Sequence, residues 1–387
     1  MKVVRTFHPV GQGAFYSERF YDGTQLNATH NIVFDCGVSF GNEWKVAHVV
    51  NQAFTNDDVI DYLFISHLDY DHVSLVKTLI SQVKRVENIV LPLVSEEQLI
   101  IAMANYRILG IDGMALFFQE ILNRKNGGVE VPTVHFVGEK DQSEIENADI
   151  WESGTGMPVS WIPEWAFIPY NVEFRSRRKE LINELGNVLK DPVFSNAINQ
   201  MGWPLIENEN ELFEKLKEED FAEKILTIPV LRRAIRRAYA SIEGDVNENS
   251  LLLYSGPVRQ EPVKGYYRIE DCISCNPLCH CAYHRAGCLY TGDSTCNMAD
   301  WKNRFAEVWG FIGTIQLPHH GSVESFDVST NAFDRPYIIP VSFGNNNKYG
   351  HPSGKVLAYL MANGCCIQMV TEMTNSVYIQ VIGRRKV

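Results

Sequence analysis

The chain has 387 residues, of which 45% are hydrophobic and 21% are charged. This is enough apolar material for one large domain or two domains of ordinary size. A net charge of −12 excludes general nucleic-acid binding by bulk charge, although it leaves room for a local basic patch. Residues 1–7 are too short and too interrupted by charge to predict a signal peptide, and no apolar run reaches the length of a membrane helix. We therefore expect a cytoplasmic protein that makes no membrane contact.

The first part of the chain predicts strands followed by a helix. Residues 3–40 contain short apolar runs separated by turns, and Asn31–Gly37 is predicted as a buried strand. Asp35 near the end of this strand has two interpretations. It either orients a histidine of a nearby metal site or is an ordinary turn residue. Residues 45–60 are predicted to form a helix.

The densest cluster of reactive side chains follows the apolar strand Leu63–Ile65. His67, Asp69, Asp71 and His72 come directly after it in the chain. Imidazole and carboxylate ligands suit divalent zinc, manganese or iron. Because Asp71 and His72 are adjacent, they can diverge toward a second ion, which predicts two neighbouring metals of the kind used in hydrolysis. The alternative is a helix start, with Asp69 or Asp71 as the N-cap.

The next segments favour a mixed α/β sheet. Residues 73–83 place apolar side chains at helical spacing, and residues 87–91 are predicted as a strand. Strand, loop, helix and strand in this order form a βαβ-like unit. We also expect a helix over 95–123, a strand over 131–137, and two strands separated by a proline-rich turn within 148–172.

Residues 173–243 differ in character and are predicted to be a helical insertion. Two basic runs, 175–179 and 232–237, flank the acidic stretch 207–223. The basic runs either pair with the acidic stretch on solvated faces, or form an electropositive rim that guides an anionic substrate. The insertion is also a candidate docking site for a protein partner.

Residues 270–288 concentrate cysteine and histidine. Thiols stay mostly reduced in the cytoplasm, so this cluster indicates metal binding rather than disulfides. Four such ligands would close a tetrahedral zinc site with a structural role. Spacing alone does not select the four, and the alternative is a loop of free thiols. Cys288 begins the next strand and is expected to be a small buried hydrophobe. The candidate ligands are Cys272, Cys275, Cys279, Cys281 and His284.

Three later runs are each predicted as a strand that ends in polar residues. These runs are 288–294, 311–322 and 337–342. Because rigid strands that end at one rim can assemble a site there, we expect their polar residues to lie together. These residues are Asp293, His319, His320 and, in the loop after the third run, His351. A helix over 353–363 and one or two strands over 367–381 complete the prediction.

Eight short motifs occur in a characteristic order along the chain. They are Gly11-Gln12-Gly13, Phe34-Asp35-Cys36-Gly37, Ser66-His67-Leu68-Asp69-Tyr70-Asp71-His72, Asn249-Ser250-Leu251, Thr291-Gly292-Asp293, Pro318-His319-His320-Gly321-Ser322, Ser342-Phe343-Gly344 and Gly350-His351-Pro352. Together they resemble the metallo-β-lactamase superfamily, in the branch that includes the metallo-hydrolase domain of DNA-uptake (competence) proteins and the phosphorylcholine esterases. The resemblance implies a four-layer αββα sandwich over residues 1–387, interrupted by the 173–243 and 270–288 insertions.

The resemblance also implies roles for individual residues. The first metal would be bound by His67 and Asp69. The second would be bound by Asp71, His72 and His319, with Asp293 bridging the two. His320 and His351 would bind the scissile phosphate or protonate the leaving group, and Asp71 would also steer the nucleophile.

The implied activity is that of a metal-dependent hydrolase with two divalent ions, zinc or manganese. We expect a phosphodiesterase that acts on a nucleotide, a nucleic acid or another anionic phosphodiester. One alternative is hydrolysis of a carboxylic ester, thioester or lactam on the same metals. Another is a regulatory or binding subunit with weak catalysis.

Overall fold

A computed structural model describes residues 1–93, 132–138, 149–171, 178–240, 250–258, 266–273 and 285–385, apart from short gaps at 24, 40, 158, 160, 204–205, 219–220, 222–223, 226–227 and 330–331. The helix expected over 95–123 lies outside the described residues. So do Cys275, Cys279, Cys281 and His284 of the expected structural zinc site, and the side chain of Cys272.

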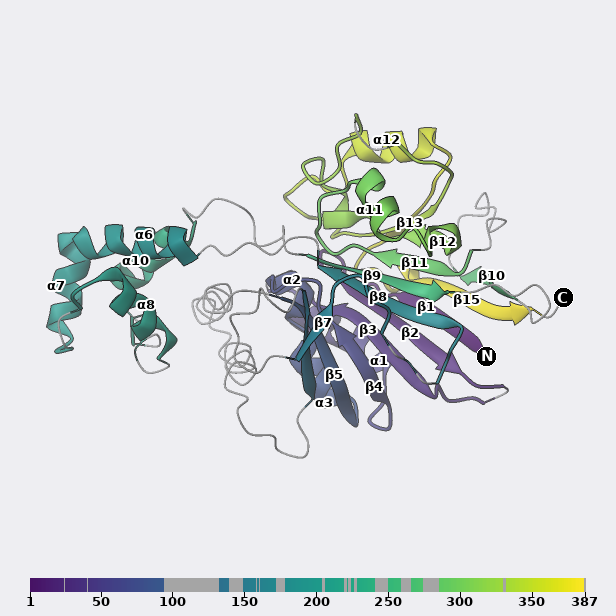
Figure 1. Ribbon diagram of the computed structural model, residues 1–387, viewed down its shortest axis with the longest axis horizontal. Helices are drawn as coiled ribbons and strands as arrows, with labels where there is room; N and C mark the ends of the chain where they lie inside the picture. Colours follow the sequence, from purple (N-terminus) through teal and green to yellow (C-terminus); the bar gives the residue numbers. More distant parts are fainter. Residues whose placement is uncertain are drawn as a thin grey trace.

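The larger of two sheets has nine strands in the order β10-β15-β1-β2-β3-β4-β5-β6-β7 (Figure 1). Pairing is antiparallel from β10 to β3 and parallel from β3 to β7. Parallel neighbours place their carboxyl ends at the same edge, where loops can build a site. The strands are β1 (Lys2–Phe7), β2 (Phe15–Tyr21), β3 (His30–Cys36), β4 (Val59–Phe64), β5 (Arg85–Pro92), β6 (Thr133–Gly138), β7 (Asp149–Glu152), β10 (Tyr266–Ile273) and β15 (Tyr378–Arg385).

The second sheet has six strands in the order β14-β13-β12-β11-β9-β8. Pairing is antiparallel among β8, β9 and β11 and parallel from β11 to β14. Strands β9, β11, β12 and β13 are buried along their whole length, as central strands covered on both faces should be. The strands are β8 (Trp165–Asn171), β9 (Leu251–Pro257), β11 (Gly287–Tyr290), β12 (Ile312–Ile315), β13 (Ile338–Ser342) and β14 (Cys366–Val370).

The two sheets pack face to face, and helices cover their outer faces (Figure 1). One apolar cluster, which includes Phe34, Leu253 and Tyr290, fills the space between the sheets. A second cluster lies between the nine-stranded sheet and helices α1 (Glu43–Ala53) and α3 (Val76–Gln82). A third lies between the six-stranded sheet and helices α11 (Met298–Arg304) and α12 (Gly354–Ala362). Three cores between four layers confirm the expected αββα sandwich.

Two helix predictions were too long. The helix expected over 45–60 ends at Ala53, because Phe54 is extended and β4 already begins at Val59. The helix expected over 73–83 is divided into α2 (Tyr70–Val73) and α3, with Ser74 and Leu75 between them. Leu75 N donates to Cys36 O, so this break ties the start of α3 to the end of β3. Strand β10 was not predicted.

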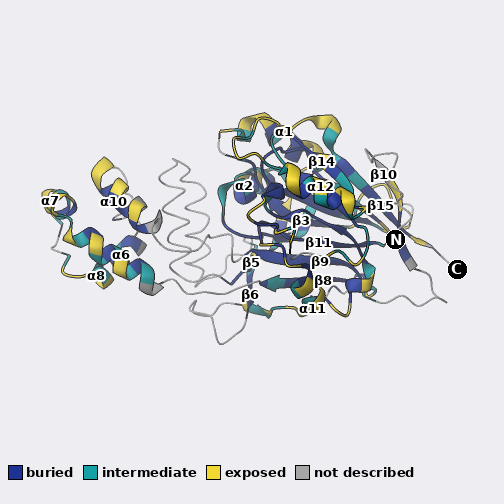
Figure 2. Ribbon diagram, turned by 90° about the horizontal axis from the view of Figure 1, so that it is seen from above, coloured by how far each residue is buried: buried dark blue, intermediate teal, exposed yellow. Residues whose placement is uncertain are grey.

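Four helices are described within residues 178–240, and we call them the helical unit. In Figure 1 they lie to one side of the sandwich, and in Figure 2 each has one buried and one exposed face. Helical structure was expected here, and the boundaries of the insertion stay a prediction. None of the described helices has the length and apolar composition needed to cross a membrane. The helices are α6 (Arg178–Lys190), α7 (Pro192–Gln200), α8 (Glu209–Lys217) and α10 (Pro229–Ala240).

Candidate metal centre

The polar residues expected at one rim follow the carboxyl ends of strands from both sheets. These strands are β4 in the nine-stranded sheet and β11, β12 and β13 in the six-stranded sheet. Contacts between their side chains show that the two sheets contribute to one site. The residues are His67, Asp69, Asp71 and His72 after β4, Asp293 after β11, His319 and His320 after β12, and His351 after β13.

Five of these residues form two groups that share His72. Within each group, the ligand atoms all lie within 4.8 Å of one another. One group is His67, His72 and Asp293, and the other is Asp71, His72 and His320. His72 Nε2 lies 3.1 Å from Asp293 Oδ1, and His320 Nε2 lies 3.1 Å from Asp71 Oδ2. Two ligand atoms about 2.1 Å from one tetrahedral ion lie about 3.4 Å apart. The spacing therefore fits a divalent cation.

Three predicted residues lie at the edge of these groups. Asp69 Oδ2 is 3.9 Å from His67 Nε2, and His319 Nε2 is 3.7 Å from Asp293 Oδ2. The ring of His351 lies 5.7 Å from the ring of His319. The histidine beside Asp71 and His72 is therefore His320, whereas the resemblance implied His319. His320 Nδ1 donates to the carbonyl of Ser342 at 2.9 Å, which directs Nε2 toward Asp71.

Four of the five rim histidines, all except His351, engage Nδ1 away from the site. His72 Nδ1 lies 2.8 Å from Asp35 Oδ2, and His319 Nδ1 lies 2.8 Å from Ser325 Oγ. His67 Nδ1 lies 2.9 Å from Ser66 Oγ and 3.1 Å from Ser250 Oγ. A proton held on Nδ1 leaves the lone pair of Nε2 free, and this is how outer hydrogen bonds orient metal-binding histidines.

Three buried polar atoms at the centre have no hydrogen-bond partner. They are His67 Nε2, His72 Nε2 and Asp293 Oδ1. The short approach of His72 to Asp293 lacks the alignment of a hydrogen bond. An unpaired buried polar atom costs about 1–3 kcal/mol, so three that converge need an occupant. Two nitrogen lone pairs and a carboxylate oxygen are ligands for a divalent cation, which fits the donor set.

The electrostatics of the site also favour a cation. Burial and the charge of His72 lower the pKa of His67 to about 3, which keeps its imidazole neutral. Burial disfavours charge on His72 too, but the carboxylates of Asp293 and Asp35 outweigh it and hold the pKa of His72 well above its usual value. Burial likewise opposes ionisation of Asp293, yet His72, His320 and His67 hold its pKa well below normal. The carboxylates of Asp35 and Asp293 thus favour a proton on His72, and a divalent cation can replace that proton.

Asp35 orients residues 66–72 after β4, which we call the metal loop. Its carboxylate accepts from Ser66 N and Ser66 Oγ, both at 2.7 Å, as well as contacting His72. Asp35 is fully buried. The first of the two interpretations of this residue is therefore confirmed, since Asp35 contacts a histidine of the site.

Strained backbone marks the same place. Among the described residues, the non-glycine residues with positive φ are Asp35 at 54°, His319 at 45° and His320 at 52°. Such conformations cost about 1–3 kcal/mol each and persist where the surrounding structure enforces them. All three side chains belong to the metal centre, so the strain is concentrated at the site.

Two glycines allow the backbone of the metal loop to come close. A Cβ on Gly37 would lie 2.5 Å from the carbonyl carbon and oxygen of Asp71, and a Cβ on Gly13 would lie 2.5 Å from Gly37 O. Ala14 N donates to Asp71 O at 3.0 Å, and Gly37 N donates to Ala14 O at 2.8 Å. The Gly11–Gly13 turn and the end of β3 thus clamp the main chain at Asp71.

The serines that orient the histidines were not predicted. Ser66 and Ser250 contact His67, and Ser325 contacts His319. Ser66 and Ser250 stand inside the quoted motifs, but a hydroxyl has no spacing rule that reveals its partner. Ser325 lies in a turn with no distinctive pattern.

The remaining predictions lie away from this centre. Cys288 is fully buried in β11, as expected. Arg232, Arg233 and Arg237 are exposed on α10 in the helical unit. Their proposed roles stay predictions.

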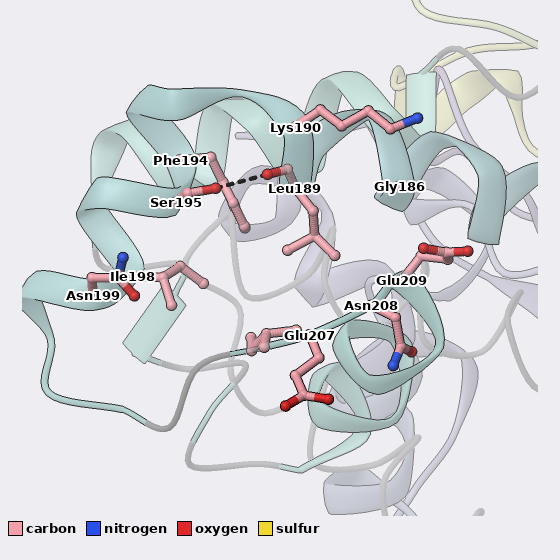
Figure 3. A pocket seen from close by; sticks show the side chains of 11 residues that line it. Gly186, Leu189, Lys190, Phe194, Ser195, Ile198, Asn199, Glu207, Asn208 and Glu209 are labelled. Atoms are coloured by element: carbon pink, nitrogen blue, oxygen red, sulfur yellow. Dashed lines mark hydrogen bonds between the residues drawn. The ribbon is translucent and has the colours of Figure 1, made fainter.

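The helical unit contains a pocket between α6, α7 and α8 (Figure 3). Leu189, Phe194 and Ile198 supply apolar side chains, and Glu207 and Glu209 supply charge. Ser195 Oγ donates to Leu189 O at 2.7 Å across this wall. The residues that line the pocket all belong to the helical unit, and the protein partner predicted for this region stays a prediction.

Comparisons with solved structures find chains of similar fold. The 1.98-angstrom crystal structure of Zn(2+)-bound PqqB from Methylobacterium extorquens is similar to this chain with a TM-score of 0.39 and 8% sequence identity. The similarity covers 96% of this chain and 98% of that chain. No protein-family model matches the chain, and no curated protein matches it.

Proposed function

We propose that this protein is a metal-dependent hydrolase of the metallo-β-lactamase type, and specifically a phosphodiesterase with two divalent cations. The observation that carries the proposal is the convergence of His67 Nε2, His72 Nε2 and Asp293 Oδ1 as buried atoms without partners. The second group, Asp71, His72 and His320, supports a second cation beside the first.

The roles of the residues follow from their contacts. His67 and Asp293 hold the first cation, with Asp69 at its exposed side. His72 lies between the two groups, and Asp71 and His320 complete the second. Bound cations would supply a water of lowered pKa and stabilise the negative charge that develops at phosphorus.

His319 and His351 lie outside the two groups of candidate ligands and are available to contact the substrate. His319 is 25% exposed, and Ser325 holds its Nδ1, so Nε2 faces the site. His351 follows it toward solvent. Burial and the neighbouring charges of His320 and His319 lower the pKa of His351, which leaves its ring neutral at pH 7. We assign both residues to contacts with the phosphoryl oxygens or the leaving group.

The test is hydrolysis by protein loaded with zinc or manganese. We expect turnover of bis-p-nitrophenyl phosphate and at least a hundredfold loss in His67→Ala and in His72→Ala. His48→Ala, which changes an exposed histidine on α1, is the control and should keep full activity. Failure to cleave any phosphodiester, together with cleavage of a chromogenic lactam or ester, would refute the phosphodiesterase assignment.

Metal analysis tests the roles of the adjacent histidines. We expect His320→Ala to bind one cation fewer than the wild type, as measured by elemental analysis after gel filtration. His319→Ala should keep the metal content and lose activity. The opposite result would return the ligand role to His319.

A further inference from the structure

A row of three aromatic rings runs from solvent to the metal centre. Tyr349 is 71% exposed, and its ring stacks on that of His351 with centroids 5.8 Å apart and planes 13° apart. The ring of His351 lies 5.7 Å from the ring of His319, whose Nε2 lies 3.7 Å from Asp293 Oδ2. These separations are typical of interacting rings. Tyr349, at the exposed end of this row, can therefore be reached by a group attached to a phosphate that is bound at the metals.

The loop that presents Tyr349 is held in place by one side chain. Asn347 Nδ2 donates to the carbonyls of Gly344 and His351, both at 2.7 Å. Asn347 Oδ1 accepts from Tyr349 N at 3.2 Å and from His351 N at 3.1 Å. An asparagine amide has two donor hydrogens and two acceptor lone pairs, so Asn347 uses its full capacity on this loop.

Neighbouring segments anchor the start of the same loop. Gly344 N donates to Gln12 Oε1 at 3.3 Å, and Asn345 N donates to Glu372 Oε2 at 3.0 Å. A loop fixed in this way loses little conformational freedom when a ligand binds. The exposure of Tyr349 is therefore not the result of a loosely held segment.

A ring stacked on one side and exposed on the other offers a flat apolar face. Planar groups bind such faces by stacking, and each stacked nucleobase contributes strongly to the binding of single-stranded nucleic acids. A quaternary ammonium group instead prefers several aromatic faces that enclose it. The single offset stack of Tyr349 on His351 favours the planar ligand.

We propose that Tyr349 and His351 form a stacking platform for the nucleobase of the substrate, so that the phosphodiester bound at the metals is a nucleoside ester. This inference rests on the proposed function, because it places the base beside a phosphate held at the metal centre. Tyr349 sets specificity and has no part in the chemical step.

The test compares two substrates that share a leaving group. Thymidine 5′-(p-nitrophenyl) phosphate carries a base, and p-nitrophenyl methyl phosphate does not. We expect Tyr349→Ala to raise KM for the thymidine ester about tenfold at unchanged kcat, and to leave the methyl ester unaffected. Tyr349→Phe should behave as the wild type, because stacking needs the ring and not the hydroxyl. Met361→Ala, which trims another exposed side chain, is the control.

Two outcomes would overturn the platform. One is an equal effect of Tyr349→Ala on both substrates, or no effect on either. The other is a selective effect on p-nitrophenyl phosphorylcholine, which would assign the ring to a quaternary ammonium group.

A binding measurement separates this inference from the proposed function. Calorimetry with the zinc-loaded protein should show that Tyr349→Ala weakens binding of thymidine 5′-monophosphate about tenfold and does not weaken binding of methyl phosphate. This result would support the platform even if neither ester were cleaved. Equal binding of thymidine 5′-monophosphate by wild type and variant would refute the platform even in an active phosphodiesterase.

Discussion

A single carboxylate, that of Asp35, connects the backbone strain of the site with the orientation of its ligands. The residue adopts a left-handed conformation at φ 54°, is fully buried, and bonds to Ser66 and His72. Burial raises the pKa of Asp35, while its bonds to His72 and Ser66 oppose that shift. Strain and burial are thus both offset by contacts that fix the imidazole of His72.

Replacing this charge should weaken metal binding without unfolding the site. In Asp35→Asn the side chain keeps its shape, and asparagine tolerates the left-handed conformation. Loss of an outer carboxylate on a metal-binding histidine typically costs 10–100-fold in affinity. We expect a decrease within that range for zinc, measured by competition with a chromophoric chelator.

Asp61→Asn is the matched control, since Asp61 also bonds a histidine, His30 Nδ1 at 2.7 Å, but outside the metal centre. Zinc affinity should be unchanged in this variant. Equal affinities in the two variants would show that Asp35 does not tune the site.

At the scale of elements, the close approach of β3 to the metal loop depends on glycine. Gly37 is the residue after β3, and the main chain of Asp71 occupies the position where its side chain would be. The metal loop therefore depends on β3 as well as on the strand β4 that precedes it.

A methyl group at Gly37 should displace the loop. We expect Gly37→Ala to destabilise the fold by about 1–3 kcal/mol, as overpacking does, and to weaken zinc binding at least tenfold. Unfolding in urea and the chelator competition measure the two effects. Gly310→Ala meets no atom within 4 Å and should change neither. Normal zinc binding in Gly37→Ala would show that the loop adapts.

Strand ends were the most predictable feature of the elements. Strands β4 and β11 to β13 are short apolar segments with polar ends. The apolar run before His67, and the Gly-Asp and His-His endings of later strands, therefore predicted that the candidate ligands lie at one rim. Helix ends were less predictable, since Phe54 and Leu75 end or interrupt helices through contacts made elsewhere in the chain. Two adjacent histidines could not be told apart by sequence, and the placement of His320 rather than His319 beside Asp71 accompanies the positive φ of both residues.

At the scale of the whole molecule, a buried ion pair joins the two sheets. Arg5 in β1 is fully buried, and its Nε lies 2.7 Å from Glu18 Oε1. Its Nη2 donates to the carbonyls of Ser255 and Ala286 in or beside the six-stranded sheet. Glu18 also accepts from Ser255 Oγ at 2.6 Å and from Tyr290 Oη at 2.9 Å. The pair therefore lies between the sheets with its polar atoms engaged.

Removing only the arginine should leave a buried carboxylate without its counterion. We expect Arg5→Met to destabilise the protein by about 3–5 kcal/mol, measured by urea unfolding. The double variant Arg5→Met/Glu18→Gln removes both charges but keeps acceptors for Ser255 and Tyr290, and should recover most of this loss. If the double variant is as unstable as the single one, packing of the long Arg5 side chain and not its charge is responsible.

The helical unit joins the sandwich next to the metal centre. It is inserted between β8 and β9, and Asn171 and Leu251, which flank it, are paired neighbours in one sheet. Ser250, the residue before Leu251, contacts His67 through its hydroxyl and accepts from Asp293 N at 3.0 Å. Strands β8 and β9 can therefore pair whether the insertion between them is long or short. After the insertion the described chain nevertheless resumes at Ser250, so the first described residue beyond the helical unit is also one that bonds a histidine of the candidate metal centre.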